Sequence, residues 1–141
     1  MRISQSLKDL IASGCDAHLV TLNKDGSPHV TVVWIGIEND EIVCAHLPRN
    51  QKVRNIERDK RVAISLEART KSPLGLTEYA VMYGEARITE GGAPELLQKL
   101  AEVYIGPGVK FPPIDNPPPG YITRIHVTRV EGVGPWTGKA V

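Results

Sequence analysis

A short segment with an unusual charge pattern is the part of this sequence best suited to chemistry. Residues 49–61 hold six basic side chains and two acidic ones. Asn50 suits a helix N-cap, because its side-chain oxygen can accept hydrogen bonds from the free N–H groups of a first turn. The spacing of Val53 and Ile56 predicts one apolar helical face after that cap. The segment therefore predicts a short basic helix.

Two of these basic residues lie where a helix disfavours them. Lys52 and Arg54 fall in or beside the predicted first turn, where the helix dipole disfavours each cation by roughly 0.3–1 kcal/mol. Bound phosphate or carboxylate reverses this effect and also satisfies the open N–H groups. One interpretation is therefore an anion-binding site. The other is a solvated basic surface, which is what most charge runs are. The residues alone leave both open.

The other residues with chemical potential form no known catalytic or metal-binding pattern. The sequence has no GxGxxG motif, Walker loop, CxxC pair or nucleophile elbow. Its four histidines, each in a strand-like run, show no zinc spacing; they are His18, His29, His46 and His126. We expect most of them to be satisfied within a sheet. No metal site is predicted, and these patterns identify no catalytic residue.

Two further features could border a flat ligand. Thr31 and Trp34 lie in one strand-like run and His46 in the next, so these side chains could line a slot if both strands end near the basic helix. The C-terminal GVGPW motif, residues 132–136, uses two glycines and a proline to place Trp136. This tryptophan either packs on its own domain or covers a planar ligand, in which case a neighbouring subunit could supply it.

Composition limits the class of protein. A chain of 141 residues predicts one domain, residues 1–141, with a core that needs no disulfide or metal. The net charge of +1 argues against a general nucleic-acid binder. Cys15 and Cys44 show no metal spacing, and we expect both to be reduced thiols of a cytoplasmic protein. The first 13 residues do not resemble a signal peptide, and no apolar run predicts a membrane span.

Local patterns predict helices and strands in an order typical of an antiparallel barrel. The expected helices are Ser4–Ser13, the short basic helix and Pro94–Ile105. The expected strands are Ala17–Leu22, His29–Ile37, Ile42–Leu47, Val62–Leu66, Tyr79–Thr89 and Tyr121–Val130. Asp25-Gly26 is a strong hairpin signal, and Gly84 is expected at a bulge or a close approach. The fold class is therefore mainly β (α+β), an antiparallel split barrel with short helices at its edges.

Two segments are expected to lack regular structure. Arg69–Thr77 is polar and contains proline and glycine, which predicts a loop. Gly106–Gly120 holds six prolines, which exclude regular helix and central strand. The second segment is either a disordered loop or a rigid lid, and Phe111 gives it a side chain that can dock.

Several of these motifs together resemble the split β-barrel flavin-binding family related to pyridoxamine 5′-phosphate oxidase. The resemblance covers roughly residues 5–130 and is closest to the actinobacterial branch that binds coenzyme F420, a deazaflavin with a phosphate and a polyglutamate tail. The matching positions are Asp25, Gly26 and Pro28; the strand ending near Trp34; Lys52, Arg54 and Asn55; Arg58, Asp59, Arg61 and Val62; and Tyr83 to Ala86. The GVGPW ending is similar to members of that branch.

The resemblance implies a homodimer with a cofactor groove at each end of the subunit interface. Lys52, Arg54 and Asn55 would then hold the cofactor phosphate or anionic tail. The strand Pro28–Val33 and the pair His46-Leu47 would border the ring, and Trp136 would cover it from the partner chain. The residues implied in cofactor binding are Pro28, Thr31, Val32, Val33, His46, Leu47, Lys52, Arg54, Asn55, Gly134, Pro135 and Trp136.

The resemblance also implies an activity. The expected function is hydride transfer between reduced F420 and a small unsaturated or quinone-like acceptor, with the chemistry supplied by the cofactor. A backbone N–H, Tyr79 or Tyr83 could donate a proton. The alternatives are an FMN-dependent oxidase or reductase of the same fold, and a non-catalytic module that binds a cofactor or tetrapyrrole. No nucleic acid or membrane partner is expected.

Overall fold

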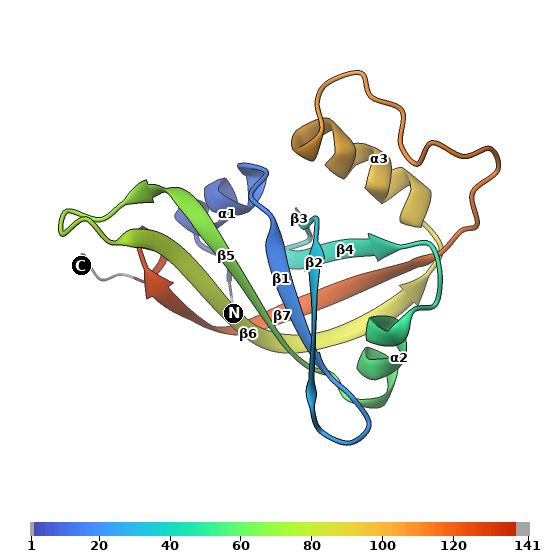
Figure 1. The fold of residues 1–141 in the computed structure, drawn as a ribbon, viewed down its shortest axis with the longest axis horizontal. Coiled ribbons are helices and arrows are strands. Elements are labelled where there is room, and N and C mark those ends of the chain that lie inside the picture. The colour runs from blue at the N-terminus through green and yellow to red at the C-terminus, as the bar shows by residue number, and fades with distance from the viewer. Residues whose placement is uncertain (1, 138–141) are drawn as a thin grey trace.

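A computed structural model describes residues 2–137 of the chain. Within this range, seven antiparallel strands form one sheet in the order β2-β1-β5-β6-β7-β4-β3, with three α-helices around it (Figure 1). The strands are β1 Ala17–Leu22, β2 Pro28–Val33, β3 Gly36–Glu38, β4 Glu41–His46, β5 Arg61–Lys71, β6 Thr77–Glu90 and β7 Tyr121–Val133. The helices are α1 Gln5–Ala12, α2 Gln51–Arg58 and α3 Ala93–Tyr104, with a 3-10 turn at Pro135–Thr137. The predicted mainly β, antiparallel fold is confirmed.

The sheet curls around a core but does not close into a continuous barrel. β2 is an edge strand paired only with β1, while β4 is paired with β7 and β3. Val33 of β2 and Cys44 of β4 nevertheless belong to the same buried core cluster. We call the gap between β2 and β4, which do not pair with each other, the split. Peptide groups along an unpaired strand edge have no ladder partners, so they are available to other groups.

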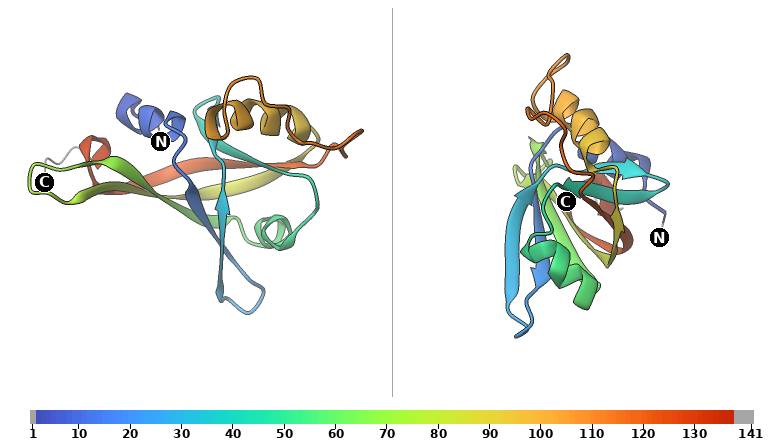
Figure 2. Two further views of the ribbon diagram at one scale, coloured as in Figure 1. Left: turned by 45° about the horizontal axis from the view of Figure 1, so that its top comes forward. Right: turned by 90° about the vertical axis from the view of Figure 1, so that its right-hand side faces the viewer.

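The helices lie at different sides of the sheet. α1 buries Leu7, Leu10 and Ile11 in the main core. α3 lies against β4, and α2 lies on the other side of the sheet beside the β1–β2 hairpin (Figures 1 and 2). None of the helices in the described range has the length and apolar character that a membrane span requires.

The predicted strand His29–Ile37 is wrong as a single element. The chain leaves the β1 ladder after Val33, and β3 begins at Gly36 on the opposite edge of the sheet. The hydroxyl of Tyr104 explains the break: it accepts a hydrogen bond from the Ile35 N–H at 3.0 Å and lies 3.3 Å from the Ile35 carbonyl. The backbone of Ile35 therefore has partners without a neighbouring strand, while its side chain stays 1% exposed.

The predicted loop Arg69–Thr77 is also wrong at both ends. β5 continues to Lys71, which pairs with Thr77 at the start of β6, so the turn covers only residues 72–76. A register shift between Glu67 and Lys71 precedes this last pair. The extension is exposed and polar, so no apolar alternation marked it in the sequence. β7 likewise continues past the predicted end at Val130, to Val133.

A close backbone contact makes Gly84 sensitive to substitution. The register of β6 and β7 shifts between Tyr83 and Gly84, which confirms the expected bulge. A Cβ at Gly84 would lie 2.3 Å from the His126 carbonyl oxygen, whereas one at Gly36 would lie 3.0 Å from the flexible Leu100 side chain. Backbone cannot move aside as a side-chain methyl can, so the two glycines differ in what they tolerate.

We expect Gly84→Ala to lower the free energy of unfolding by about 2–3 kcal/mol and Gly36→Ala to lower it by about 1 kcal/mol or less. Urea unfolding followed by circular dichroism measures both variants. Equal losses in the two variants would show that the β6–β7 contact relaxes and does not constrain the sheet.

Candidate functional site

Helix α2 begins where the sequence predicts. The Asn50 side-chain oxygen accepts a hydrogen bond from the Val53 N–H at 3.3 Å, and the Asn50 carbonyl accepts one from the Arg54 N–H at 3.1 Å. The cap satisfies one of the first-turn N–H groups that a helix cannot satisfy itself. The predicted cap is confirmed, and the positive end of the helix dipole lies at this point.

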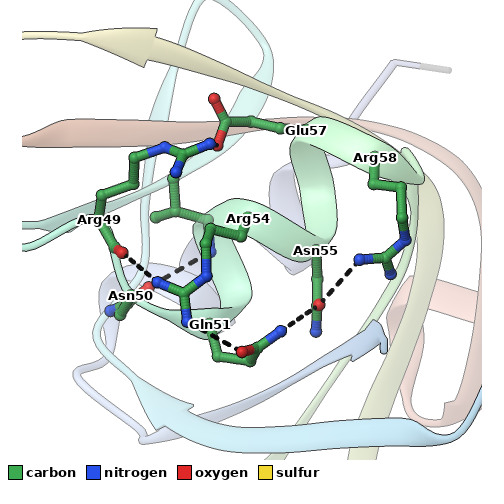
Figure 3. A network of polar contacts seen from close by, with 8 residues as sticks. Arg49, Asn50, Gln51, Arg54, Asn55, Glu57 and Arg58 are labelled. Carbon is green, nitrogen blue, oxygen red and sulfur yellow. Dashed lines mark hydrogen bonds and ion pairs between the residues drawn. The ribbon is translucent and has the colours of Figure 1, made fainter. Parts of the chain in front are cut away.

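The arginines at the start of α2 differ in how their charges are compensated (Figure 3). Arg49 forms an ion pair with Glu57 at 2.7 Å. Arg54 instead donates to the Arg49 carbonyl at 2.7 Å and to the Gln51 side-chain oxygen at 2.9 Å. Both acceptors are neutral, so the exposed Arg54 guanidinium keeps its positive charge available at the helix start.

Lys52 points away from these arginines and into the split. Its Nζ donates to the Thr31 hydroxyl on β2 at 3.3 Å. The ammonium group also lies near Cys44 and His46 of β4. Burial raises the pKa of Cys44 and lowers that of His46, and the charge of Lys52 opposes the first shift and adds to the second. Burial holds the pKa of Lys52 below its ordinary value of 10.5. A half-buried cation therefore lies between β2 and β4.

His46 is a buried sheet residue. Its side chain is 5% exposed, and Nε2 shares a hydrogen bond of 2.8 Å with the Thr123 hydroxyl. Burial first, and the charge of Lys52 second, lower its pKa to about 3, so the ring is neutral at physiological pH. At 5% exposure, His46 offers almost no surface to a ligand in the split. Leu47, the next residue, is partly exposed.

Asn55 joins α2 to the β1–β2 hairpin. Its amide nitrogen donates to the Thr21 hydroxyl at 3.0 Å and to the Asn23 side-chain oxygen at 2.9 Å. Its oxygen accepts from Gln51 at 2.8 Å and from Arg58 at 3.3 Å. The side chain is fully buried and has protein partners for both amide atoms. This geometry gives Asn55 a positioning role and does not support the predicted direct contact with an anion.

The residues of β2 that were predicted to border the cofactor ring lie on both faces of the strand. Thr31 and Val33 face the core side, whereas Val32 points outward and is 59% exposed; Pro28, at the strand start, is exposed too. Side chains of all four cannot form one wall, because neighbouring residues in a strand point to opposite faces. The unpaired backbone edge of β2 is the feature that runs along the whole split.

The C-terminal tryptophan packs on its own chain. Trp136 Nε1 donates to the Tyr79 carbonyl at 2.8 Å, and its ring contacts the main core cluster. Figure 1 shows this end of the chain at the opposite end of the sheet from α2. The fold therefore does not bring the C-terminal motif close to Lys52 of the same chain. The predicted contact of Gly134, Pro135 and Trp136 with a cofactor stays a prediction, and it would require a partner chain.

Some residues that support the strands beside the split could not be identified from the sequence. Thr123 holds His46 from a position 77 residues away, and Tyr104 holds Ile35 from 69 residues away. A threonine in a strand and a tyrosine near the end of a helix are common, so only the folded chain identifies them. Among the described residues, no three side chains of His, Cys, Asp or Glu are grouped to hold a metal.

The fold and the gap between β2 and β4 define a split β-barrel. The chain matches the family model of pyridoxamine 5′-phosphate oxidase over residues 4–134, and it belongs to that family. No curated protein matches the chain.

Solved structures share the fold. An F420 reductase superposes with a TM-score of 0.71 at 24% identity, covering 88% of this chain and 94% of that one. A conserved hypothetical protein from Mycobacterium tuberculosis gives 0.70 at 27% identity, with 92% and 83% covered. A heme binding protein from Mycobacterium smegmatis gives 0.63 at 20% identity, with 90% of this chain and 52% of that one covered.

The lowered pKa of Lys52 predicts how the stability of the fold changes with pH. The unfolded chain holds this proton more tightly than the folded one, so the charged ammonium destabilises the fold at neutral pH. The penalty is complete below the folded-state pKa and is relieved as pH rises from there toward 10.5. Lys52→Met keeps an unbranched apolar side chain and removes the charge.

We expect Lys52→Met to raise the unfolding midpoint at pH 7 and to lose this advantage as the pH approaches 10.5. Lys60→Met is the matched control, because Lys60 is exposed and pairs with Glu85 at 2.6 Å; its midpoint should stay level or fall slightly. Thermal unfolding of the cofactor-free proteins measures this. A lower midpoint for Lys52→Met at pH 7 would contradict the burial penalty.

Proposed function

We propose that this protein binds coenzyme F420 at the split and transfers hydride between the reduced cofactor and a small unsaturated or quinone-like acceptor. The family match supports a flavin-type cofactor, and the likeness to an F420 reductase supports the deazaflavin. The observation that carries the proposal is the half-buried Lys52 between β2 and β4. A cation held there at a cost in stability is explained by an anionic ligand.

The uncompensated charge around α2 favours a ligand with several anionic groups. Among the described residues, three cations of the segment 49–61 pair with carboxylates and three do not. The pairs are Arg49–Glu57, Lys60–Glu85 and Arg61–Asp59; the cations without a carboxylate partner are Lys52, Arg54 and Arg58. F420 offers a phosphate and a polyglutamate tail, whereas FMN offers one phosphate. Of these cations, Lys52 and Arg54 lie in the first turns of α2, and together they favour F420 over FMN.

A second observation fits a ligand at the split. His29 Nδ1 is buried and is the only such side-chain nitrogen or oxygen without a hydrogen-bond partner in the described part of the chain. It lies on β2 opposite Thr21, on the same strand face as Thr31. Buried polar atoms are rarely left unpaired, so a group bound beside β2 would complete this strand.

In this proposal the chain supplies binding and orientation. Lys52 and Arg54 hold the anionic groups, Thr31 fixes the Lys52 ammonium, and the edge of β2 borders the ring. The bound reduced deazaflavin supplies the hydride. The apolar side chains of β2 and β4 limit water at the split.

We also propose that two copies of the chain form the complete groove. The outer face of the sheet exposes apolar side chains, with Val30 57%, Val32 59% and Tyr79 39% exposed. Exposed apolar groups that gather on one face indicate an interface. A two-fold dimer through this face presents the same patch from both subunits and lets the Trp136 of one approach α2 of the other.

Val32→Asp should convert this dimer to a monomer without unfolding it, because the side chain is exposed in the single chain and a buried carboxylate at an interface is costly. Val103→Asp is the control, since Val103 is 51% exposed on α3, away from the outer face. Sedimentation at low micromolar concentration reports the mass. A monomeric wild-type protein, or a dimer that Val32→Asp does not weaken, would rule out this interface.

The cofactor proposal is tested by titrating the protein with oxidised F420 and with FMN. We expect tighter binding of F420, and a loss of roughly 10- to 100-fold in Lys52→Met, because a hydrogen bond to a charged group contributes about 1.5–3 kcal/mol. Lys60→Met should bind as the wild type does.

The other outcomes point elsewhere. Tight FMN with weak F420 binding would assign the chain to the flavin-binding side of the family. Binding of heme alone would favour a tetrapyrrole module. An unchanged F420 affinity in Lys52→Met would show that the cofactor does not use the split.

A further inference from the structure

Two lysines in and just after α2 have amines in very different surroundings. Lys60 is exposed and forms an ion pair with Glu85 at 2.6 Å. Lys52 is half-buried, and its Nζ donates to the neutral Thr31 hydroxyl at 3.3 Å. Within residues 2–137, Lys52 takes part in none of the ion pairs. An ammonium group has three donors, so the protein satisfies the charged form of Lys52 only in part.

The titratable side chains that act on the charge of Lys52 come from β4. They are Cys44 and His46, and burial keeps both neutral near neutral pH. The other charged residues of α2 have other partners, and β2 adds one titratable residue on the Thr31 face; these residues are Arg54, Glu57, Arg58 and His29. Among the residues that the structure describes, no anion therefore holds the proton on Nζ.

A lysine in this setting is suited to act as a nucleophile. The neutral amine attacks a carbonyl carbon, and burial without an opposite charge increases the neutral fraction. Desolvated lysines form imines in proteins for this reason. Water reverses the reaction, and the buried side chains of Val33 on β2 and Cys44 on β4 limit water beside Nζ. The geometry thus favours both the formation and the persistence of an imine.

We propose that Lys52 is a site of reversible imine formation with small conjugated aldehydes. The neutral Nζ bonds to the aldehyde carbon, the carbonyl oxygen leaves as water with the two amine protons, and no electrons are exchanged with another reagent. An unhindered aldehyde is required because Nζ lies between two strands, and conjugation stabilises the C=N bond. The adduct removes the cation that the proposed function assigns to anionic groups, so the aldehyde and the cofactor exclude each other.

Reductive trapping measures this reactivity directly. Benzaldehyde with cyanoborohydride converts each imine to a stable benzylamine, and peptide mass spectrometry gives the rate at each lysine. At pH 7 we expect Lys52 to react roughly three- to tenfold faster than Lys60, because the hydrogen bond to Glu85 raises the pKa of Lys60 whereas burial lowers that of Lys52, and one pKa unit changes the neutral fraction about tenfold. In urea the two rates should be equal. Equal rates in the folded protein, or a slower Lys52, would overturn the proposal.

A substitution on β2 tests whether the surroundings of Nζ control the rate. Thr31→Val removes the hydroxyl that accepts from the ammonium group, so it should speed the trapping of Lys52 roughly twofold and leave Lys60 unchanged. Thr128→Val is the matched control, because Thr128 is exposed on β7. A lysine that reacts only because it reaches solvent would show the same rate in both variants.

Oxidised F420, added before benzaldehyde, separates this proposal from the proposed function. Protection of Lys52 with Lys60 unaffected would support both. Fast trapping of Lys52 without F420 binding would reject the proposed cofactor and support the imine site. F420 binding that depends on Lys52, with Lys52 trapped no faster than Lys60, would overturn the imine site alone.

Discussion

The position of the candidate site depends on the buried side chain of Asn55. Its amide joins α2 to Thr21 and Asn23 of the β1–β2 hairpin, and its oxygen accepts two hydrogen bonds from α2. Leaving such buried groups unpaired costs about 1–3 kcal/mol each, so these hydrogen bonds favour one position of α2 on the sheet. In that position the Lys52 side chain reaches Thr31 on β2. A residue with no ligand contact thereby determines where the cation lies.

The split is a second constraint, because β2 and β4 do not pair with each other across it. β2 ends the sheet on one side, and β4 joins β7 and the short β3. In a closed barrel, hydrogen bonds between strands would close this gap. Here a lysine spans the gap, and burial disfavours its charge. Sites that hold such unfavourable groups are common where proteins bind ligands, since function tolerates a local loss of stability.

The sequence predicted those features that local chemistry decides. Asn50 caps α2 and Asp25-Gly26 makes a hairpin because neighbouring residues suffice for both. The break after Val33 could not be read locally, because the hydroxyl that replaces the ladder comes from Tyr104. The same holds for His46: its strand pattern was visible, but its hydrogen-bond partner Thr123 lies 77 residues away in the chain. The charge pattern located α2 and left open which cations point inward.

The groups inside the split differ in what they can do near neutral pH. Burial raises the pKa of the Cys44 thiol to about 12 and, with the charge of Lys52, lowers that of His46 to about 3, so both stay neutral. Lys52 carries a pKa that burial has lowered, and an anion placed beside it acts in the opposite direction. Ligand binding and the protonation of Lys52 are therefore coupled. Of these three groups, Lys52 is the one that carries a charge near neutral pH and whose pKa an anion would raise.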